Sequence, residues 1–157
     1  MWDNRINSQI GVISDTHGHL SAKVAHIFKH VDLIVHAGDI DQPDVLASLK
    51  SIAPVVAVRG NMDRGTWAIE LAKTEIVTFD NIRLYVIHDI DKLDMDPAVA
   101  GFSAVISGHS HQPLVEEQAG VLFLNPGSAS MPRHDFNASV ALLHIRGAEL
   151  EVELVCL

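Results

Sequence analysis

The chain has 157 residues, 48% of them hydrophobic, and a formal net charge of −9 at pH 7. This length and composition fit one compact domain, expected over residues 1–157, and exclude a disordered tail. The acidic balance argues against tight binding to nucleic acid or to acidic membranes, unless a bound cation adds positive charge locally.

The sequence predicts neither a signal peptide nor a membrane span. Its first nine residues, MWDNRINSQ, lack the apolar centre of a signal peptide. No apolar run approaches the roughly eighteen residues that a membrane helix needs. The single cysteine, Cys156, excludes an intramolecular disulfide and suits a reducing compartment. We therefore expect a cytoplasmic protein.

The first half of the chain alternates short apolar runs with amphipathic segments. Strands are expected at 9–14, 32–39 and 54–61, because each is a short apolar run rich in β-branched residues. Helices are expected at 21–30 and 42–51, where apolar residues recur at helical spacing. Strand, helix, strand, helix and strand at this pitch predict two βαβ units and a parallel sheet.

The second half has the pattern of antiparallel pairing. Hairpins are expected at 74–89, turning at Asp80-Asn81, at 113–125, turning at Ala119-Gly120, and at 139–157, turning at Gly147. A further strand is expected at 104–108 and a short helix at 96–102. The predicted fold class is therefore α/β, with mixed sheets sandwiched by helices, a βαβαβ first half and a hairpin-rich second half.

Polar residues able to bind a cation follow five of the predicted strands. Ligands of α/β sheets bind beyond the carboxyl ends of the strands, so we expect these side chains to meet in one crevice. The set is Asp15, His17, Asp39, Asn61, His88, His109 and His111. Imidazole with carboxylate suits divalent Mn, Fe, Zn, Ni or Co, but not a thiolate site or an all-oxygen calcium cage. Seven ligands suit two ions that share a bridge, which can clamp a phosphate and activate a water.

The order DTH…GD…GNMD…H…GHSH, between Ile13 and Arg133, resembles the calcineurin-like metallophosphoesterase superfamily. It is most similar to the small single-domain phosphodiesterases of bacteria and archaea, a branch related to the retromer subunit Vps29. The loop NPGSASMPR at 125–133 is also similar to that branch. The resemblance implies the calcineurin-like metallophosphoesterase fold and two divalent ions. We expect manganese, with Ni, Fe, Zn, Co or Mg as alternatives.

The resemblance also implies roles for individual residues. A first ion would bind Asp15, His17 and His111, a second would bind Asn61, His88 and His109, and Asp39 would bridge the two. The catalytic residues would be Asn61, Asp63 and His88, and the substrate would contact Asn61 and Arg133. Because residues i and i+2 of an extended chain point to the same side, we expect His109 and His111 to serve adjacent ions.

Two positions depart from the family pattern. Met62 stands where protein phosphatases of the superfamily carry a histidine that is thought to protonate the leaving group, so direct acid catalysis from that position is lost. Asp89 stands where glycine is frequent, and is either an acceptor that orients an imidazole or a solvated turn residue. Away from the motifs, His36 lies inside a predicted strand and is expected to fill the core.

The function expected from this reading is that of a dinuclear metal-dependent phosphodiesterase. A metal-bridging hydroxide would attack a small phosphodiester or nucleotide-type substrate in line. One alternative is a Vps29-like protein-binding scaffold, against which the complete ligand set argues. The other is a nucleotide or phosphomonoester phosphatase, against which the few positive residues near the motifs argue. A homodimer paired through hairpin edges is left open.

Overall fold

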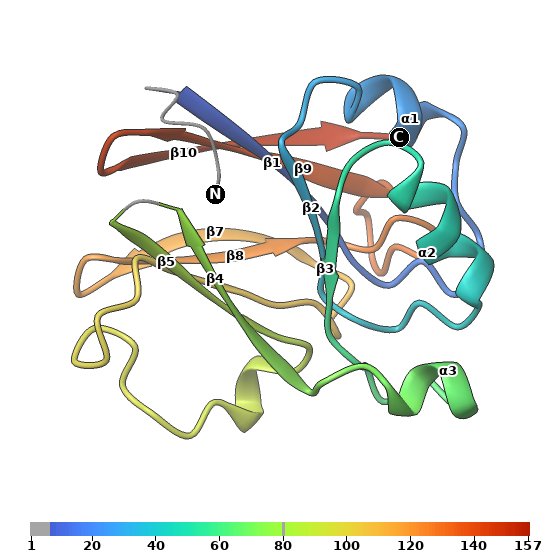
Figure 1. Ribbon diagram of the computed structural model, residues 1–157, viewed down its shortest axis with the longest axis horizontal. Helices are drawn as coiled ribbons and strands as arrows, with labels where there is room; N and C mark the ends of the chain where they lie inside the picture. Colours follow the sequence, from blue (N-terminus) through green and yellow to red (C-terminus); the bar gives the residue numbers. More distant parts are fainter. Residues whose placement is uncertain (1–6, 80) are drawn as a thin grey trace.

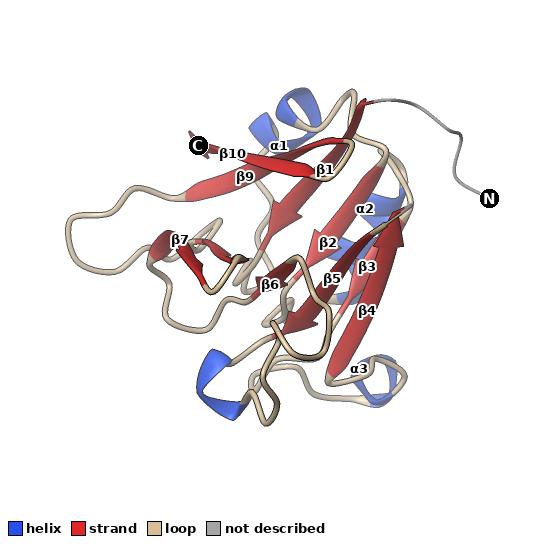
Figure 2. Ribbon diagram, turned by 90° about the vertical axis from the view of Figure 1, so that its left-hand side faces the viewer, coloured by secondary structure: helices blue, strands red, loops and turns tan. Residues whose placement is uncertain are grey.

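The computed structural model describes residues 7–79 and 81–157. In this part of the chain the strands are β1 (Asn7–Ile13), β2 (Leu33–His36), β3 (Val55–Ala57), β4 (Thr74–Phe79), β5 (Ile82–Ile87), β6 (Ala104–Ile106), β7 (Pro113–Gln118), β8 (Val121–Pro126), β9 (Ser139–Arg146) and β10 (Glu149–Cys156). The helices are α1 (Lys23–Ile27), α2 (Pro43–Lys50) and α3 (Thr66–Ile69), with a 3-10 helix at Ile90–Lys92. Strands therefore make up most of the regular structure (Figure 2).

The strands form two five-stranded sheets that lie one over the other (Figure 1). The first sheet has the order β10-β9-β1-β2-β3, in which β1, β2 and β3 are parallel and β9 and β10 are antiparallel additions. The second has the order β4-β5-β6-β8-β7, with β5, β6 and β8 parallel. The predicted mixed α/β fold, with its parallel first half, is confirmed.

All three predicted hairpins are present. The strands β4 and β5, β7 and β8, and β9 and β10 pair antiparallel. Ala119, Gly120 and Gly147 have positive φ angles of 51°, 78° and 62°, as tight turns between antiparallel strands require. The third expected turn includes Asp80, which lies outside the described residues.

The main core lies between the two sheets, and the helices cover only one of them. Alternate residues of the first sheet, such as Val12 and Val35, pack against Leu84 and Ile106 of the second. On its other face the first sheet buries Ile13 against α1 and α2. The outer face of the second sheet is covered by side chains of the β5–β6 connection, among them Ile90 of the 3-10 helix and Phe102, and not by an α-helix. The helices therefore flank one side of the stacked sheets.

The helix expected at 96–102 is a single turn. Asp96 Oδ1 accepts the N–H groups of Ala98 and Val99, in the manner of a helix cap, and Asp96 O accepts the N–H of Ala100. The turn ends at Gly101, which has φ +84°. The left-handed conformation of this glycine stops the helical hydrogen bonding after one turn. The short α3 was not expected from the sequence.

No helix in the described part of the chain is long and apolar enough to cross a membrane. Residues 1–6, part of the segment read for a signal peptide, lie outside the described residues. The cytoplasmic location and the homodimer stay predictions.

Candidate metal centre

The carboxyl ends of the parallel strands of both sheets meet at one place. The N–H of His109, after β6, donates to Asp15 Oδ2, after β1, at 3.1 Å. The N–H of Asp15 donates to Gly38 O, which follows β2, and the N–H of Gly108 donates to His88 O, which follows β5. The first of these bonds crosses from one sheet to the other, and the other two join neighbouring strand ends within each sheet. They bring the polar residues after the strands together, as the sequence predicts.

Five of the seven expected ligands have left-handed backbone conformations. They are Asp15, His17, Asp39, His109 and His111, with φ between 46° and 68°. Such angles are uncommon in residues other than glycine, and they gather at functional sites. The extended geometry expected for the 109–111 segment is therefore wrong. Its two imidazoles still reach different groups, because the chain turns at each histidine.

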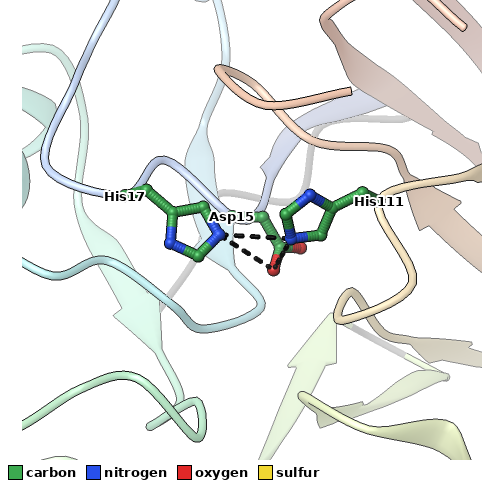
Figure 3. Close-up of side chains that lie close together, drawn as sticks. All are labelled: Asp15, His17 and His111. Atoms are coloured by element: carbon green, nitrogen blue, oxygen red, sulfur yellow. Dashed lines mark hydrogen bonds and ion pairs between the residues drawn. The ribbon is translucent and has the colours of Figure 1, made fainter. Parts of the chain in front are cut away.

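The first group consists of Asp15, His17 and His111, which come from two chain segments and point toward one another (Figure 3). The two Nε2 atoms of the histidines lie 3.2 Å apart. Asp15 Oδ1 lies 3.3 Å from the Nε2 of His111 and 3.9 Å from that of His17. The three atoms form a small triangle with room for an ion at its centre.

The outer nitrogens of the two histidines fix which atoms face the triangle. His111 Nδ1 lies 2.6 Å from Met131 O, a carbonyl that can only accept, so this nitrogen carries the proton. His17 Nδ1 lies 3.0 Å from Asp41 Oδ2. In the neutral rings both Nε2 atoms then point lone pairs inward, toward a carboxylate oxygen. Three electron-rich atoms converge, and a divalent cation satisfies all of them.

Asp15 itself is fully buried. Burial raises the pKa of Asp15, against the hydrogen bond from the Ser14 hydroxyl that lowers it. Its Oδ2 accepts from that hydroxyl at 2.6 Å, whereas Oδ1 has no hydrogen-bond partner. A buried carboxylate oxygen without a donor is costly, and here it faces the first group. Coordination to a cation would remove that cost.

The second group consists of Asp39, His88 and His109, with Asn61 beside them. His88 Nε2 lies 3.3 Å from Asp39 Oδ2 and 3.0 Å from Asn61 Oδ1. Asn61 Oδ1 also lies 3.1 Å from His109 Nδ1. His88 Nδ1 donates to Ala37 O at 2.7 Å, so its Nε2 faces inward, as in the first group.

The charges of this group are coupled. Burial works against the charged form of both partners, yet the hydrogen bond between them raises the pKa of His88 and lowers that of Asp39. Without an ion, a proton on His88 is the positive charge that balances the carboxylate. The group therefore has the donor atoms of a candidate cation site. The bridging role expected for Asp39 stays a prediction.

Asp63 holds the loop that carries Asp39. Its carboxylate accepts the backbone N–H groups of Asp39, Ile40, Asp41 and Gly60, at 2.8–3.0 Å. Both oxygens are used by these donors, so Asp63 positions the ligand loop. The catalytic roles expected for Asp63, Asn61 and His88 stay predictions.

Close approach of the backbone to this site requires glycine at two positions. A Cβ on Gly60 would collide with Asp39 Oδ1, and one on Gly108 would collide with the Ser14 hydroxyl. The same Gly108 Cβ would lie 2.6 Å from Asp15 Oδ2. Only a residue without a side chain fits at either place.

Several residues that support the ligands were not predicted from the sequence. Asp41 orients His17, as described above, and its position two residues after Asp39 was the only available signal. Asn125, at the end of β8, donates to Gly108 O at 2.9 Å, and the Ser128 hydroxyl donates to Asp15 O at 2.8 Å. Both lie in the segment 125–133, whose sequence resembles the family. The resemblance indicated that this segment matters, but it did not predict these hydrogen bonds.

Asp89 has the turn role considered for it, and its contact with an imidazole is longer than a hydrogen bond. Its Oδ1 accepts the N–H of Asp91 and caps the 3-10 helix, while its Oδ2 lies 3.8 Å from His109 Nε2. His36 is fully buried, as expected, between the Thr16 hydroxyl and the Gly38 N–H. Arg133 is exposed in the loop that follows Met131, and its contact with substrate stays a prediction.

A cavity of about 550 Å³ opens beside the second group. His88, His109 and Asn61 line one side of it. Arg59, Lys73 and Lys92 also line it. The expectation of few positive residues near the site is therefore incomplete. Arg59 precedes Asn61 by two residues and Lys92 follows His88 by four, and the fold brings Lys73 to the same cavity.

A family model for the calcineurin-like phosphoesterase superfamily domain matches residues 9–148. The chain belongs to this superfamily. It is 38% identical over 158 residues to a probable metallophosphoesterase of Methanothermobacter thermautotrophicus, covering 93% of this chain and 91% of that protein. It is 28% identical over 137 residues to a phosphodiesterase of Methanocaldococcus jannaschii, covering 76% of this chain and 82% of that one.

The fold also matches the structure of vacuolar protein sorting 29 from Cryptosporidium parvum. The TM-score is 0.77 at 18% identity, over 95% of this chain and 97% of the other. At this identity the match shows the fold alone. The resemblance to the calcineurin-like metallophosphoesterase superfamily is confirmed, and the metallophosphoesterase relatives support a hydrolase.

Proposed function

We propose that this protein is a metal-dependent phosphodiesterase that holds one divalent ion in each of the two ligand groups. The observation that carries the proposal is the convergence of inward-facing acceptor atoms in both groups. Such an arrangement is stable only with positive charge at its centre. The relatives named metallophosphoesterase and phosphodiesterase support the same reading.

In the first group, Asp15 carries the negative charge and the two histidines supply neutral nitrogens. In the second, Asp39 carries the charge, and His88 and His109 supply the nitrogens, with Asn61 Oδ1 as a further donor. Nitrogen with carboxylate oxygen suits manganese, which we propose as the native ion, and also iron, zinc, nickel or cobalt. When bound, two such ions neutralise the phosphate and acidify a water.

The side chains around the ions have separate tasks. Asn61, exposed at the mouth of the second group, is positioned to touch both an ion and a phosphate oxygen. Asp63 keeps the Asp39 loop in place, and Asp89 lies beside the outer nitrogen of His109. No side chain acts as the nucleophile, so we expect no covalent intermediate, and the leaving alcohol takes its proton from solvent.

The direct test is hydrolysis of bis(p-nitrophenyl) phosphate beside p-nitrophenyl phosphate. The protein is stripped with chelator and reloaded with Mn²⁺, Zn²⁺, Ni²⁺ or Mg²⁺ in turn. We expect metal-dependent turnover of the diester that His109→Ala abolishes. His26→Ala, at an exposed position of α1, is the matched control and should retain activity.

The possible outcomes separate the alternatives. Faster turnover of the monoester would move the assignment to a phosphatase. Failure to bind metal in either group would overturn the proposal and leave the protein-binding scaffold, whose fold the chain shares.

A further inference from the structure

The cavity beside the second group has an unusual charge for this protein. The whole chain has 11 lysines and arginines against 20 acidic residues, yet Arg59, Lys73 and Lys92 all line this one cavity. In the described part of the chain none of the three forms an ion pair. Three unpaired cations around one opening attract an anion.

The backbone ties these three residues to the site. The N–H of Arg59 donates to Ala72 O at 2.8 Å, which places Arg59 beside the segment of Lys73. The N–H of Lys92 donates to Asp89 O at 3.1 Å, one residue after His88. The pairing of Thr74 with Ile87 joins the start of β4 to the end of β5 at the same edge (Figure 1). The fold therefore brings the segments of all three cations to the cavity beside the second group.

The acidic groups in the cavity do not cancel this charge. Asp63 lines it, but four N–H donors already satisfy its carboxylate. Asp89 also lines it, and its Oδ1 is engaged by the 3-10 helix. Two carboxylates and three cations thus line the cavity. The formal charge of these five lining residues remains positive.

We propose that this cavity receives an arm of the substrate that carries a second phosphate group. The inference rests on the proposed phosphodiesterase function: the scissile phosphate lies at the metal groups, and the second phosphate lies among Arg59, Lys73 and Lys92. A volume of about 550 Å³ holds a nucleoside-phosphate-sized arm. No Phe, Tyr or Trp lines the cavity in the described residues, so recognition is of the phosphate and not of a base.

Two chromogenic diesters test the inference. One is the p-nitrophenyl ester of thymidine 5′-phosphate, and the other is the same ester with a phosphate on the 3′ oxygen. Both release p-nitrophenol when water replaces it on the 5′ phosphorus, and they differ only in the second phosphate. For the manganese-loaded protein we expect kcat/KM to be at least about tenfold higher with the 3′-phosphate.

The variants locate the effect. Arg59→Met, Lys73→Met and Lys92→Met combined should bring the ratio of the two kcat/KM values close to one. Lys92→Met alone, at an exposed position, should lower the ratio and covers the case in which the triple variant fails to fold. The matched control Lys50→Met, exposed on α2, should keep the full ratio. Raising the ionic strength from about 0.01 M to about 0.15 M should also lower it.

The outcomes distinguish the two proposals. Equal kcat/KM for both esters in the unmodified protein overturns the second-phosphate site and leaves the phosphodiesterase intact. If neither ester turns over with any metal, the phosphodiesterase assignment fails. Isothermal titration calorimetry then tests whether the cavity binds a second phosphate. Tighter binding of thymidine 3′,5′-bisphosphate than of thymidine 5′-phosphate, lost in Lys92→Met, supports an anion site. Equal binding of the two nucleotides overturns it.

Discussion

The Nε2 atoms of His17 and His111 lie 3.2 Å apart, although Asp41 and Met131 O already occupy the outer nitrogens of the two rings. Two neutral imidazoles that face each other with lone pairs repel, and the nearby carboxylate of Asp15 adds to the repulsion. A cation at the centre, as proposed above, would turn this repulsion into three favourable contacts.

Metal should therefore stabilise the fold. At a free Mn²⁺ concentration about one hundred times the dissociation constant, the free energy of unfolding rises by about 2.7 kcal/mol, which for this size raises Tm by about 5–10 °C. Asp15→Asn, which removes the charge of the first group, should reduce the gain. Asp44→Asn, exposed in the first turn of α2, should not. Differential scanning calorimetry measures both, and an unchanged Tm on adding metal contradicts the cation-holding role.

The Asp63 carboxylate should be important for stability. Asp63→Ala leaves four backbone N–H groups without their acceptor, three of them on the loop of Asp39. We expect a loss of at least about 3 kcal/mol in the free energy of unfolding, measured in urea, together with weaker metal binding. Asp94→Ala, at an exposed position, is the control. A loss under about 1 kcal/mol would show that water replaces the carboxylate.

Gly108 should tolerate no side chain. Its Cβ would meet Ser14 and Asp15, so Gly108→Ala must displace the ligand or the strand end. We expect metal affinity to fall by at least about tenfold, which corresponds to about 1.4 kcal/mol. Gly120→Ala is a stringent control, because Gly120 has a left-handed φ of 78° but nothing near its Cβ. That variant should lose stability and keep its metal affinity; equal affinity loss in both would point to a global effect.

His36 gives a pH dependence of stability in the metal-free protein. Burial lowers the pKa of His36 to about 3, from 6.5, and His88, Asp39 and His17 are the charged or titratable groups around it. Between these values the unfolded chain binds a proton that the folded protein does not. The free energy of unfolding should therefore fall as pH drops from 6.5 toward 3, by up to about 1.4 kcal/mol per unit from this residue.

The comparison of wild-type protein with His36→Gln isolates that contribution. Gln lacks the titrating ring and keeps a donor for the Thr16 hydroxyl, which lies 3.1 Å from His36 Nε2. Urea unfolding in chelator at several pH values should give a shallower slope for the variant over this range. Identical slopes would mean that His36 does not titrate on unfolding.

The sequence predicted the features of the site that depend on the order of the strands. Apolar runs that end in Asp15, Asp39, Asn61 and His88 have to deliver those residues to one edge of parallel strands, and they do. Residue identities alone also sufficed to propose the ligand set. Local spacing sufficed for the hairpins, because a turn such as Ala119-Gly120 carries its own signal.

The sequence did not predict the backbone conformations and side-chain positions that depend on how the loops run between strands. The left-handed backbone at His109 and His111 arises from hydrogen bonds to distant segments, such as His109 N–H to Asp15. Lys73 and Lys92 reach the same cavity only because β4 and β5 pair in one register. Neither feature has a local pattern. The one-turn segment before Gly101 failed as a helix because a single glycine ended it.

The most direct test is a titration of stripped protein with Mn²⁺ while hydrolysis of bis(p-nitrophenyl) phosphate is followed in the same sample. If both ligand groups hold an ion and both are needed, turnover should rise and level off at two equivalents per chain. A plateau at one equivalent, or equal turnover without metal, would contradict the dinuclear phosphodiesterase.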